Sequence, residues 1–336
     1  MQAPWRVQIF FFFSIGILLA QDAIPNATRY SDAIRLNNQG VLSEEQGRFS
    51  EAESAFRGAL LAWEMLPTAS SEGIVATLNG LGNLLRVEGH YREAERLLRR
   101  AISLEEKAGA PARLDLAFSL NSLGALYGNV REPARATRLL ERGLEIREEI
   151  LGCNHPLITS SLDNLADALI QQNKLDQAKT LYRRSLSILE TQSDPSLLAM
   201  TRCKLADLYF RKLRNLMQAE KLYREALVAW RRAPEHDHPQ IGLTLTGLAE
   251  VYFAQRRYTE VEPLLKEALE IQEKALGLDH PQVAKVLLDY AWLLRKQHRQ
   301  RDAGVMEKRA KNMMKAFSTE DHDLGTVDVS SLKRQR

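Results

Sequence analysis

A unit of about 42 residues repeats along most of this 336-residue chain. A small residue stands at the same place in each copy, at intervals of 42, 42, 42, 40, 43 and 42 residues: Gly40, Gly82, Gly124, Ala166, Ala206, Ala249 and Ala291. Periods of 20 to 50 residues are typical of stacked repeat arrays, in which each copy packs only on its neighbours. We therefore expect seven repeats, numbered one to seven below, over residues 31–317.

Each copy has the pattern of two amphipathic helices joined by a turn. Apolar residues recur at intervals of three and four, as in Leu78, Leu81, Leu84 and Leu85, and then in Leu97, Leu98 and Ile102. The turn contains Gly47 in repeat one and Gly89 in repeat two, where a left-handed backbone closes a helix at little cost. The pattern predicts an all-α fold, with the small residues at places where helices approach closely.

Two stretches resemble one family closely: "LNGLGNLLRVEGHYREAERLLRRAI" at 78–102 and "LTGLAEVYFAQRRYTEVEPLLKEALEIQEKALGLDHPQVA" at 245–284. They are similar to tetratricopeptide repeat (TPR) proteins, and above all to the long-repeat type found in kinesin light chains. The resemblance implies a right-handed solenoid of about seven helix–turn–helix repeats. Repeat three departs from the pattern at Arg131 and Pro133, and repeat five has one extra residue in "RKLRNLMQA". Both departures fall at the turn between helices, so we expect local adjustment with the stack intact.

The first helices of a TPR array line a concave groove, where the resemblance implies that peptides bind. Residues three before, two before and one after each small residue share one side of a helix and should face that groove. Our candidate partner-binding residues follow from this rule: Asn37, Asn79, Asn83, Asn121, Asp163, Asp167, Asp207 and Glu250. Asparagine amides could bond the main chain of an extended peptide. The alternative is that they bond a neighbouring helix.

The acids turn the middle and later groove negative, and Phe210, Phe253 and Trp292 are expected nearby. This combination would suit a segment that carries Lys or Arg beside an apolar side chain. The alternative is a solvated helix face that Lys204 and Arg211 neutralise.

Three His-Pro pairs, at His155, His238 and His280, raise the possibility of metal or proton chemistry. They fall between repeats, and the equivalent place in another repeat holds Asp194, a good acceptor for a helix N-terminus. We therefore expect N-caps rather than an active site. The chain has no HExxH motif, phosphate loop, dinucleotide fingerprint or catalytic triad pattern, so we expect no enzyme, cofactor, metal site or small-molecule substrate. Cys153 and Cys203 are expected to be unpaired.

The charge balance is nearly even, with 46 Lys plus Arg against 43 Asp plus Glu, so electrostatics predict no nucleic-acid partner. Repeat seven carries a basic surface, made of Arg295, Lys296, Arg299, Arg301, Lys308, Arg309, Lys311 and Lys315. It suits a wettable end cap for the stack, and the alternative is a site for an anionic partner.

The N-terminus has the pattern of a secretory signal peptide over residues 1–20, where Arg6 precedes "IFFFFSIGILLA". We expect cleavage after Ala20 and export, periplasmic or secreted. Twelve apolar residues are short against the ~20 that span a bilayer, so a retained membrane anchor is the weaker alternative. Residues 21–30 are expected to be a short linker and residues 318–336 a flexible tail.

Together these patterns predict a non-catalytic scaffold that binds a peptide segment or partner protein along the concave groove. The alternative is a structural subunit of an envelope or secreted assembly, which docks through its convex face or its basic C-terminal end.

Overall fold

The computed structural model describes residues 23–45, 47–66, 71–109, 113–191, 194–233 and 239–323, and within these ranges its regular elements are all helices. The α-helices are α1 (Ala23–Glu45), α2 (Phe49–Glu64), α3 (Ser71–Val87), α4 (Tyr91–Ala108), α5 (Arg113–Asn129), α6 (Pro133–Leu151), α7 (Thr159–Gln171), α8 (Leu175–Leu189), α9 (Pro195–Asp207), α10 (Leu216–Trp230), α11 (Pro239–Ala254), α12 (Tyr258–Leu276), α13 (Pro281–Lys296) and α14 (Gln300–Asp323). Two short elements are η2 (Pro156–Ile158) and η3 (Leu208–Lys212). None of these described helices has both the length and the apolar character needed to cross a membrane.

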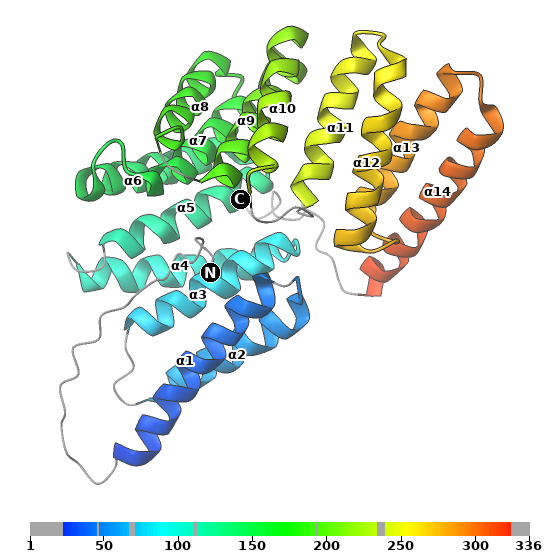
Figure 1. Cartoon of the computed structure of the whole chain (residues 1–336). Helices are drawn as coiled ribbons and strands as arrows, with labels where there is room; N and C mark the ends of the chain where they lie inside the picture. The colour runs from blue at the N-terminus through cyan, green and yellow to red at the C-terminus, as the bar shows by residue number, and fades with distance from the viewer. Residues whose placement is uncertain are drawn as a thin grey trace. The chain divides into compact units, whose positions relative to one another are not determined.

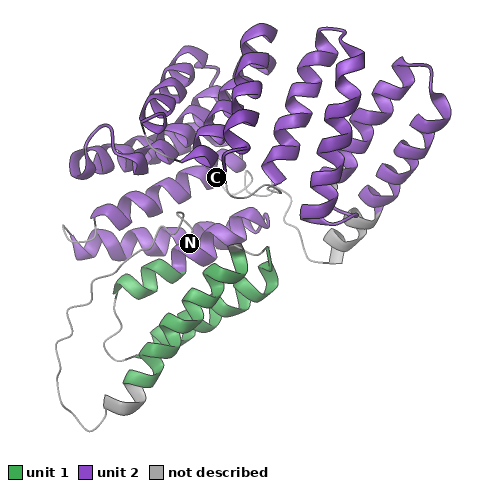
Figure 2. Cartoon of the chain, viewed as in Figure 1, with its two compact units in different colours: residues 1–77 green, residues 78–336 purple. Residues whose placement is uncertain are grey.

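The chain divides into two compact units, residues 1–77 and residues 78–336 (Figure 2). In the first unit, α1 packs on α2. In the second unit, each helix packs on the next in order from α4 to α14, as Figure 1 shows for α11 to α14. This consecutive pairing confirms the predicted all-α solenoid of two-helix repeats.

The small residues mark close approaches between the two helices of a repeat, as predicted. A Cβ atom on Gly124 would lie 2.6 Å from Leu140 Cγ, and one on Gly82 would lie 2.9 Å from Leu98 Cγ. Side chains of the second helix therefore occupy the volume that a larger residue would need.

The turn inside each repeat requires a left-handed residue, and glycine is not the only residue that fills it. Gly47 and Gly89 have φ values of 71° and 86°, but Arg131 takes the same place in repeat three with φ 57°. Asn173, Arg214, Arg256 and His298 also have positive φ at the corresponding turns. Pro133 begins α6, where its missing N–H leaves no helical bond unmade. The departures in repeat three are thus absorbed locally, as expected.

The extra residue of repeat five is absorbed before the turn. A π-helical turn, η3, runs from Leu208 to Lys212 and continues α9. A π turn takes up one more residue than an α turn, so Ala206 and Ala219 stand thirteen residues apart where other repeats have twelve. The adjustment lies in the first helix of the repeat, next to the pocket described below.

The junctions between repeats are capped as predicted. His155 Nδ1 accepts a hydrogen bond from Leu157 N at 3.2 Å, and His280 Nδ1 accepts one from Gln282 N at 3.2 Å. Asp194 Oδ1 accepts from two backbone N–H groups, at 3.1 and 3.0 Å. His238 lies outside the described residues. In the described part of the chain, no group of three or more His, Cys, Asp or Glu residues could hold a metal ion, and Cys153 and Cys203 are free thiols.

The first helix starts earlier than predicted, because α1 begins at Ala23 inside the segment expected to be a linker. At the other end α14 continues to Asp323, beyond the expected end of the array. The expected signal peptide, with its cleavage site after Ala20, and residues 324–336 of the expected tail lie outside the described residues.

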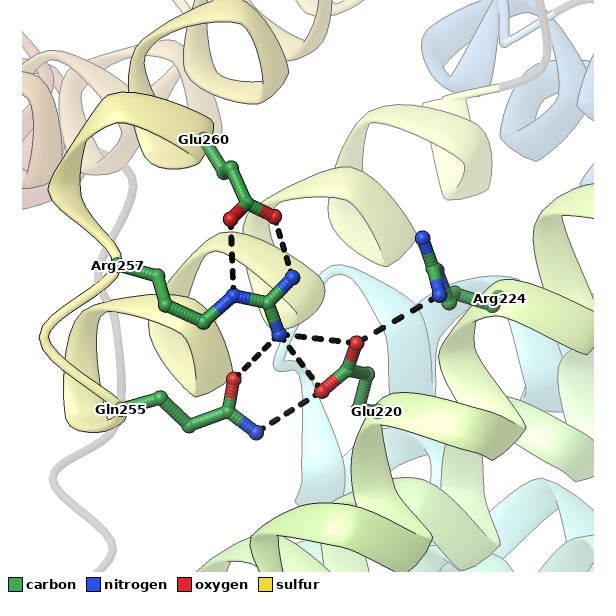
Figure 3. Close-up of polar contacts among 5 residues, drawn as sticks. All are labelled: Glu220, Arg224, Gln255, Arg257 and Glu260. Atoms are coloured by element: carbon green, nitrogen blue, oxygen red, sulfur yellow. Dashed lines mark hydrogen bonds and ion pairs between the residues drawn. The ribbon is translucent and has the colours of Figure 1, made fainter.

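A charged cluster at the turns joins repeats five and six. Arg257, which precedes α12, donates to Glu220 of α10 at 2.9 Å and to Glu260 at 3.0 Å. Gln255 also donates to Glu220, at 2.9 Å, so the carboxylate of α10 receives donors from the following repeat (Figure 3).

The same cluster recurs 42 residues later between repeats six and seven. Arg299 donates to Glu262 at 3.0 Å and to Asp302 at 3.0 Å. Burial opposes the charge on Glu262, but hydrogen bonds from Arg299 and Tyr290 lower the pKa of this carboxyl to about 2. Charge networks of this kind stabilise the register between neighbouring repeats more than isolated surface pairs do.

Candidate functional site

Asn79 and Asp163, each three before a small residue, face the next repeat instead of an open groove. Asn79 Nδ2 donates to Ser119 Oγ at 2.8 Å, and Thr201 Oγ1 donates to Asp163 Oδ2 at 2.7 Å. Asn79 is only 4% exposed and Asp163 only 8%. Burial, opposed by Lys204, raises the pKa of Asp163. These two predicted site residues are therefore ties between repeats, which was the alternative considered for the asparagines.

Asn37 makes the same kind of tie within the first unit, where Thr77 Oγ1 donates to Asn37 Oδ1 at 3.0 Å. Asn121 is half-buried and accepts from Asn164 Nδ2 at 3.3 Å, again across a repeat junction. The column that begins with Asn37 thus serves the stacking of repeats at each described junction where it is asparagine.

A residue near the end of the second helix completes these ties in repeats one, two and five, and sequence reasoning missed it. Trp63 Nε1 donates to Thr77 Oγ1 at 3.2 Å, and Trp230 Nε1 donates to Thr244 Oγ1 at 3.1 Å. The equivalent residue in repeat two is Glu105. Each stands fourteen residues before its Ser or Thr partner, a spacing that could have found them.

Arg147 occupies the same place in repeat three and is buried. Its Nη1 donates to Ser161 Oγ at 2.7 Å and to the Leu157 carbonyl at 3.0 Å. Burial lowers the pKa of this guanidinium. At these junctions the same position therefore bonds to the next repeat, while the bonding group differs: an indole, a carboxyl or a guanidinium.

The residues one after each small residue lie closer to solvent, since five of the seven are half-buried and two, Val41 and Trp292, are exposed. Asp167 accepts from Lys204 at 2.8 Å, and Asp207 accepts from Arg211 at 2.9 Å and from Tyr223 at 3.0 Å. Lys204 and Arg211 thus pair with acids of the middle groove, as the alternative reading anticipated. Asn83, in the same column, donates to Ser122 Oγ at 3.0 Å.

One pocket of about 510 Å³ lies in the second unit on repeats five to seven. Its lining comes from η3, the turn that follows η3, α11, α12 and α13: Phe210, Arg211, Arg214, Thr246, Ala249, Glu250, Phe253, Ala254, Val261, Leu265, Asp289 and Trp292. One of the eight predicted site residues, Glu250, is among these lining residues. The lining also contains the three aromatic residues that the sequence placed near this acid.

Two of these aromatic rings form a stacked pair across repeats six and seven. The centroids of Phe253 on α11 and Trp292 on α13 lie 3.4 Å apart, with planes inclined by 28°. Trp292 is 50% exposed, an unusual state for the largest apolar side chain. Lys296 Nζ lies 5.6 Å from the Trp292 ring centroid. The pocket therefore offers a rigid aromatic surface that is partly open to solvent.

The charged side chains of the pocket lining are two acids, Glu250 and Asp289, and two arginines, Arg211 and Arg214. Glu250 accepts from Arg211 at 2.7 Å and lies 3.5 Å from Lys285. Asp289 Oδ2 is buried and has no hydrogen-bond partner among the described residues. Burial, and then the charge of Glu250, raise the pKa of Asp289 to about 6. Asp289 stands two before Ala291, a position that the groove rule includes, although Asp289 was not among the predicted residues.

Three of the eight residues of the predicted basic surface of repeat seven are in ion pairs. Arg295 donates to Glu307 at 2.7 Å, and Arg309 lies 2.6 Å from Glu273 of the preceding repeat. With Arg299 bound to Glu262, three of the predicted cations already have carboxylate partners. These three residues fit a solvated end cap.

Comparisons with known proteins agree with the repeat pattern. The family model described as "Tetratricopeptide repeat" matches residues 32–107, 113–191, 197–274 and 241–316. No curated protein sequence matches the chain.

Solved structures share the fold at low sequence identity. BtubC (BKLC) from P. vanneervenii is 20% identical with a TM-score of 0.54, and the match covers 70% of this chain and 92% of that one. A putative kinesin light chain from P. anserina with nearly identical TPR-like repeats is 21% identical with a TM-score of 0.50, covering 61% and 97%. The Rap conjugation gene regulator of plasmid pLS20, solved in complex with the Phr* peptide, is 14% identical with a TM-score of 0.64, covering 94% and 83%.

Proposed function

Because the chain belongs to the tetratricopeptide repeat family, we propose that it is a non-catalytic scaffold that binds a peptide segment of a partner protein. Two structures of the same fold support a peptide ligand, since one is a Rap regulator in complex with the Phr* peptide and another a Rap protein with the competence and sporulation factor. The ligand site is the pocket on repeats five to seven, and no cofactor takes part.

The observation that carries the proposal is the half-exposed Trp292 stacked on Phe253 at the pocket. Tryptophan buries a large area when a partner covers it, and it loses little conformational entropy because the stack already holds it. Such residues dominate the energy of protein interfaces. The junction residues Asn79 and Asp163 are buried and so contribute to the scaffold, while Glu250 contributes to the site.

The test is selection of peptides from a random displayed library on the purified chain, followed by calorimetric titration of the selected peptides. Trp292→Ala should weaken binding at least about tenfold, because interface hot spots cost about 2 kcal/mol or more on truncation. Met217→Ala is the control, since Met217 is also exposed but lies on α10 outside the pocket lining. Equal affinity of the Trp292→Ala variant and the unsubstituted protein would reject the pocket as the site.

We also propose export, with residues 1–20 removed after Ala20. The support is the Arg6-led apolar segment of the sequence. Mass spectrometry of the mature N-terminus, together with fractionation of the producing cells, tests this proposal. Recovery of the full-length chain in the cytosol would reject it.

The alternative of a structural subunit docked through the basic end receives less support, because Arg295, Arg299 and Arg309 are already paired. Binding and fractionation experiments in solution distinguish the two functions. A peptide binder keeps one-to-one binding to a linear segment, whereas a structural subunit co-fractionates in a large complex and leaves it when the basic end is neutralised.

A further inference from the structure

Two junctions of the array place the same pair of positions together but fill them with different charges. Asp167 stands one after the small residue of repeat four, and Lys204 stands two before that of repeat five. Lys204 Nζ lies 2.8 Å from Asp167 Oδ2, so this pair is a salt bridge. Between repeats six and seven, the same two positions hold Glu250 and Asp289. The later junction therefore has an acid in the place where the earlier one has a lysine.

The acid at this place is poorly compensated by its surroundings. The charged groups that face Asp289 are Glu250 on α11, Lys285 on its own helix and Arg211 on η3. Arg211 and Lys285 both lie against Glu250, at 2.7 and 3.5 Å. Asp289 Oδ2 has no hydrogen bond to any described residue. A buried carboxyl oxygen without a donor is unfavourable by roughly 1–3 kcal/mol, and a ligand that supplied a donor would recover part of that.

The remaining lining of the pocket supplies the apolar half of a recognition surface. Phe253 and Trp292 flank the acids, and the π turn carries Phe210 into the lining from repeat five. A cation near an aromatic face is attracted to it, as Lys296 already is to Trp292. A basic side chain with an apolar neighbour would therefore find complementary groups within one pocket.

We propose that this pocket recognises one Lys or Arg side chain of an extended partner segment, held by Asp289 and Glu250, with an adjacent apolar side chain packed on Trp292. The inference rests on the proposed function and specifies its ligand. The ligand cation takes the place that Lys204 fills at the junction of repeats four and five. The occupant is a segment of another protein, chosen by charge complementarity to the acid pair.

The test uses Asp289→Lys, which reproduces the charge pattern of the earlier junction. A displayed random library of peptides is selected in parallel on the unsubstituted chain, on Asp289→Lys and on Asp176→Lys. Asp176 is an exposed acid at the start of α8 in repeat four and is not among the residues that line the pocket, so its variant controls for the change in net charge. Thermal unfolding of each variant verifies folding, and Asp289→Asn removes only the charge.

The unsubstituted chain and Asp176→Lys should enrich Lys or Arg next to an apolar residue. Asp289→Lys should reduce the affinity of a selected peptide about tenfold or more, because like charges then meet in the pocket. Asp289→Asn should give a smaller loss.

Four outcomes would overturn the inference. Enriched peptides with no preference for a basic residue would leave the proposed function standing without this specificity, whereas no enrichment at all would reject the proposed function itself. A preference for acidic residues would assign the pocket to Arg211 and Arg214. Enrichment only after deletion of residues 324–336 would assign it to the chain's own Leu332-Lys333-Arg334 sequence.

Discussion

Ser119 on α5 donates a hydrogen bond of 3.0 Å to Glu105 on α4, and so joins repeats two and three through a buried carboxyl group. Burial is the main reason that the pKa of Glu105 is raised to about 8. Asp115 and Glu106 add to the rise, while the hydrogen bond from Ser119 opposes it. The group is therefore protonated in the folded chain at neutral pH, whereas it ionises at its ordinary pKa of 4.5 in the unfolded chain.

Glu105 should make the protein less stable as pH rises from about 4.5 to about 8, because the folded state binds the proton more tightly across that window. The loss approaches about 1.4 kcal/mol per pH unit within the window. Glu105→Gln keeps the shape without the charge and should remove this dependence. Urea unfolding of both proteins at several pH values measures the difference, and parallel stability curves would contradict the assignment.

Asn79→Ala should lower the free energy of unfolding by about 1–3 kcal/mol, because Ser119 loses a buried partner. It should leave peptide affinity unchanged, since Asn79 is buried at a junction. Asn38→Ala is the matched control on an exposed site of α1, and it should change stability by less than about 0.5 kcal/mol. Urea midpoints and calorimetric titration provide the two measurements, and a loss of affinity without a loss of stability would restore Asn79 to the binding site.

Gly124→Ala should destabilise the chain by about 1–3 kcal/mol, since the new methyl group would meet Leu140 at 2.6 Å. Gly304→Ala offers the opposite case in α14, where a Cβ meets nothing within 4 Å. Alanine there should stabilise by about 0.5–1 kcal/mol through helix propensity. Thermal unfolding of the two variants should therefore shift in opposite directions, and shifts of the same sign would show that the small residue of repeat three is not needed for close packing.

His280 should stabilise the start of α13 only while its imidazole is neutral. Burial lowers its pKa below the usual 6.5, so the stabilisation is present above that value and is lost as pH falls through the lowered pKa. Protonation adds a hydrogen to Nδ1, which then cannot accept from Gln282 N. His280→Asn keeps an acceptor and should flatten this acid loss, which N-cap measurements place at about 0.5–2 kcal/mol. Thermal unfolding of both proteins as a function of pH tests this prediction. An equal loss of stability at acid pH in the two proteins would argue against the cap.

The repeat period predicted the fold because it constrains each copy in the same way. Gly82, Gly124 and their equivalents could be aligned without any structure, and the caps at His155, Asp194 and His280 followed from their places between repeats. The left-handed Arg131 could not be predicted from its residue type, because arginine rarely adopts positive φ and the surrounding turn imposes it.

The candidate site was predicted in part, and the limit was geometric. Positions three before and one after a small residue lie four residues apart, so they point only about 40° apart around the helix. The angle between stacked repeats decides which of these two positions is covered by the next repeat. That angle cannot be read from the period of the sequence. Asn79 and Asp163 were therefore placed on the open face, although they are covered. The same rule also selected Glu250, which lines the pocket together with Phe253 and Trp292.

The stacked pair of Phe253 and Trp292 links α11 to α13, so the pocket is complete only while repeat seven is docked on repeat six. In a linear array each repeat is stabilised by its neighbours alone, and a terminal repeat frays first. A segment bound across both rings would therefore hold repeat seven on repeat six. At a concentration a hundredfold above its Kd it would add about 2.7 kcal/mol to the closed form. Amide hydrogen exchange in α13 and α14 should slow when the ligand binds, which couples occupancy of the pocket to the order of the whole C-terminal end.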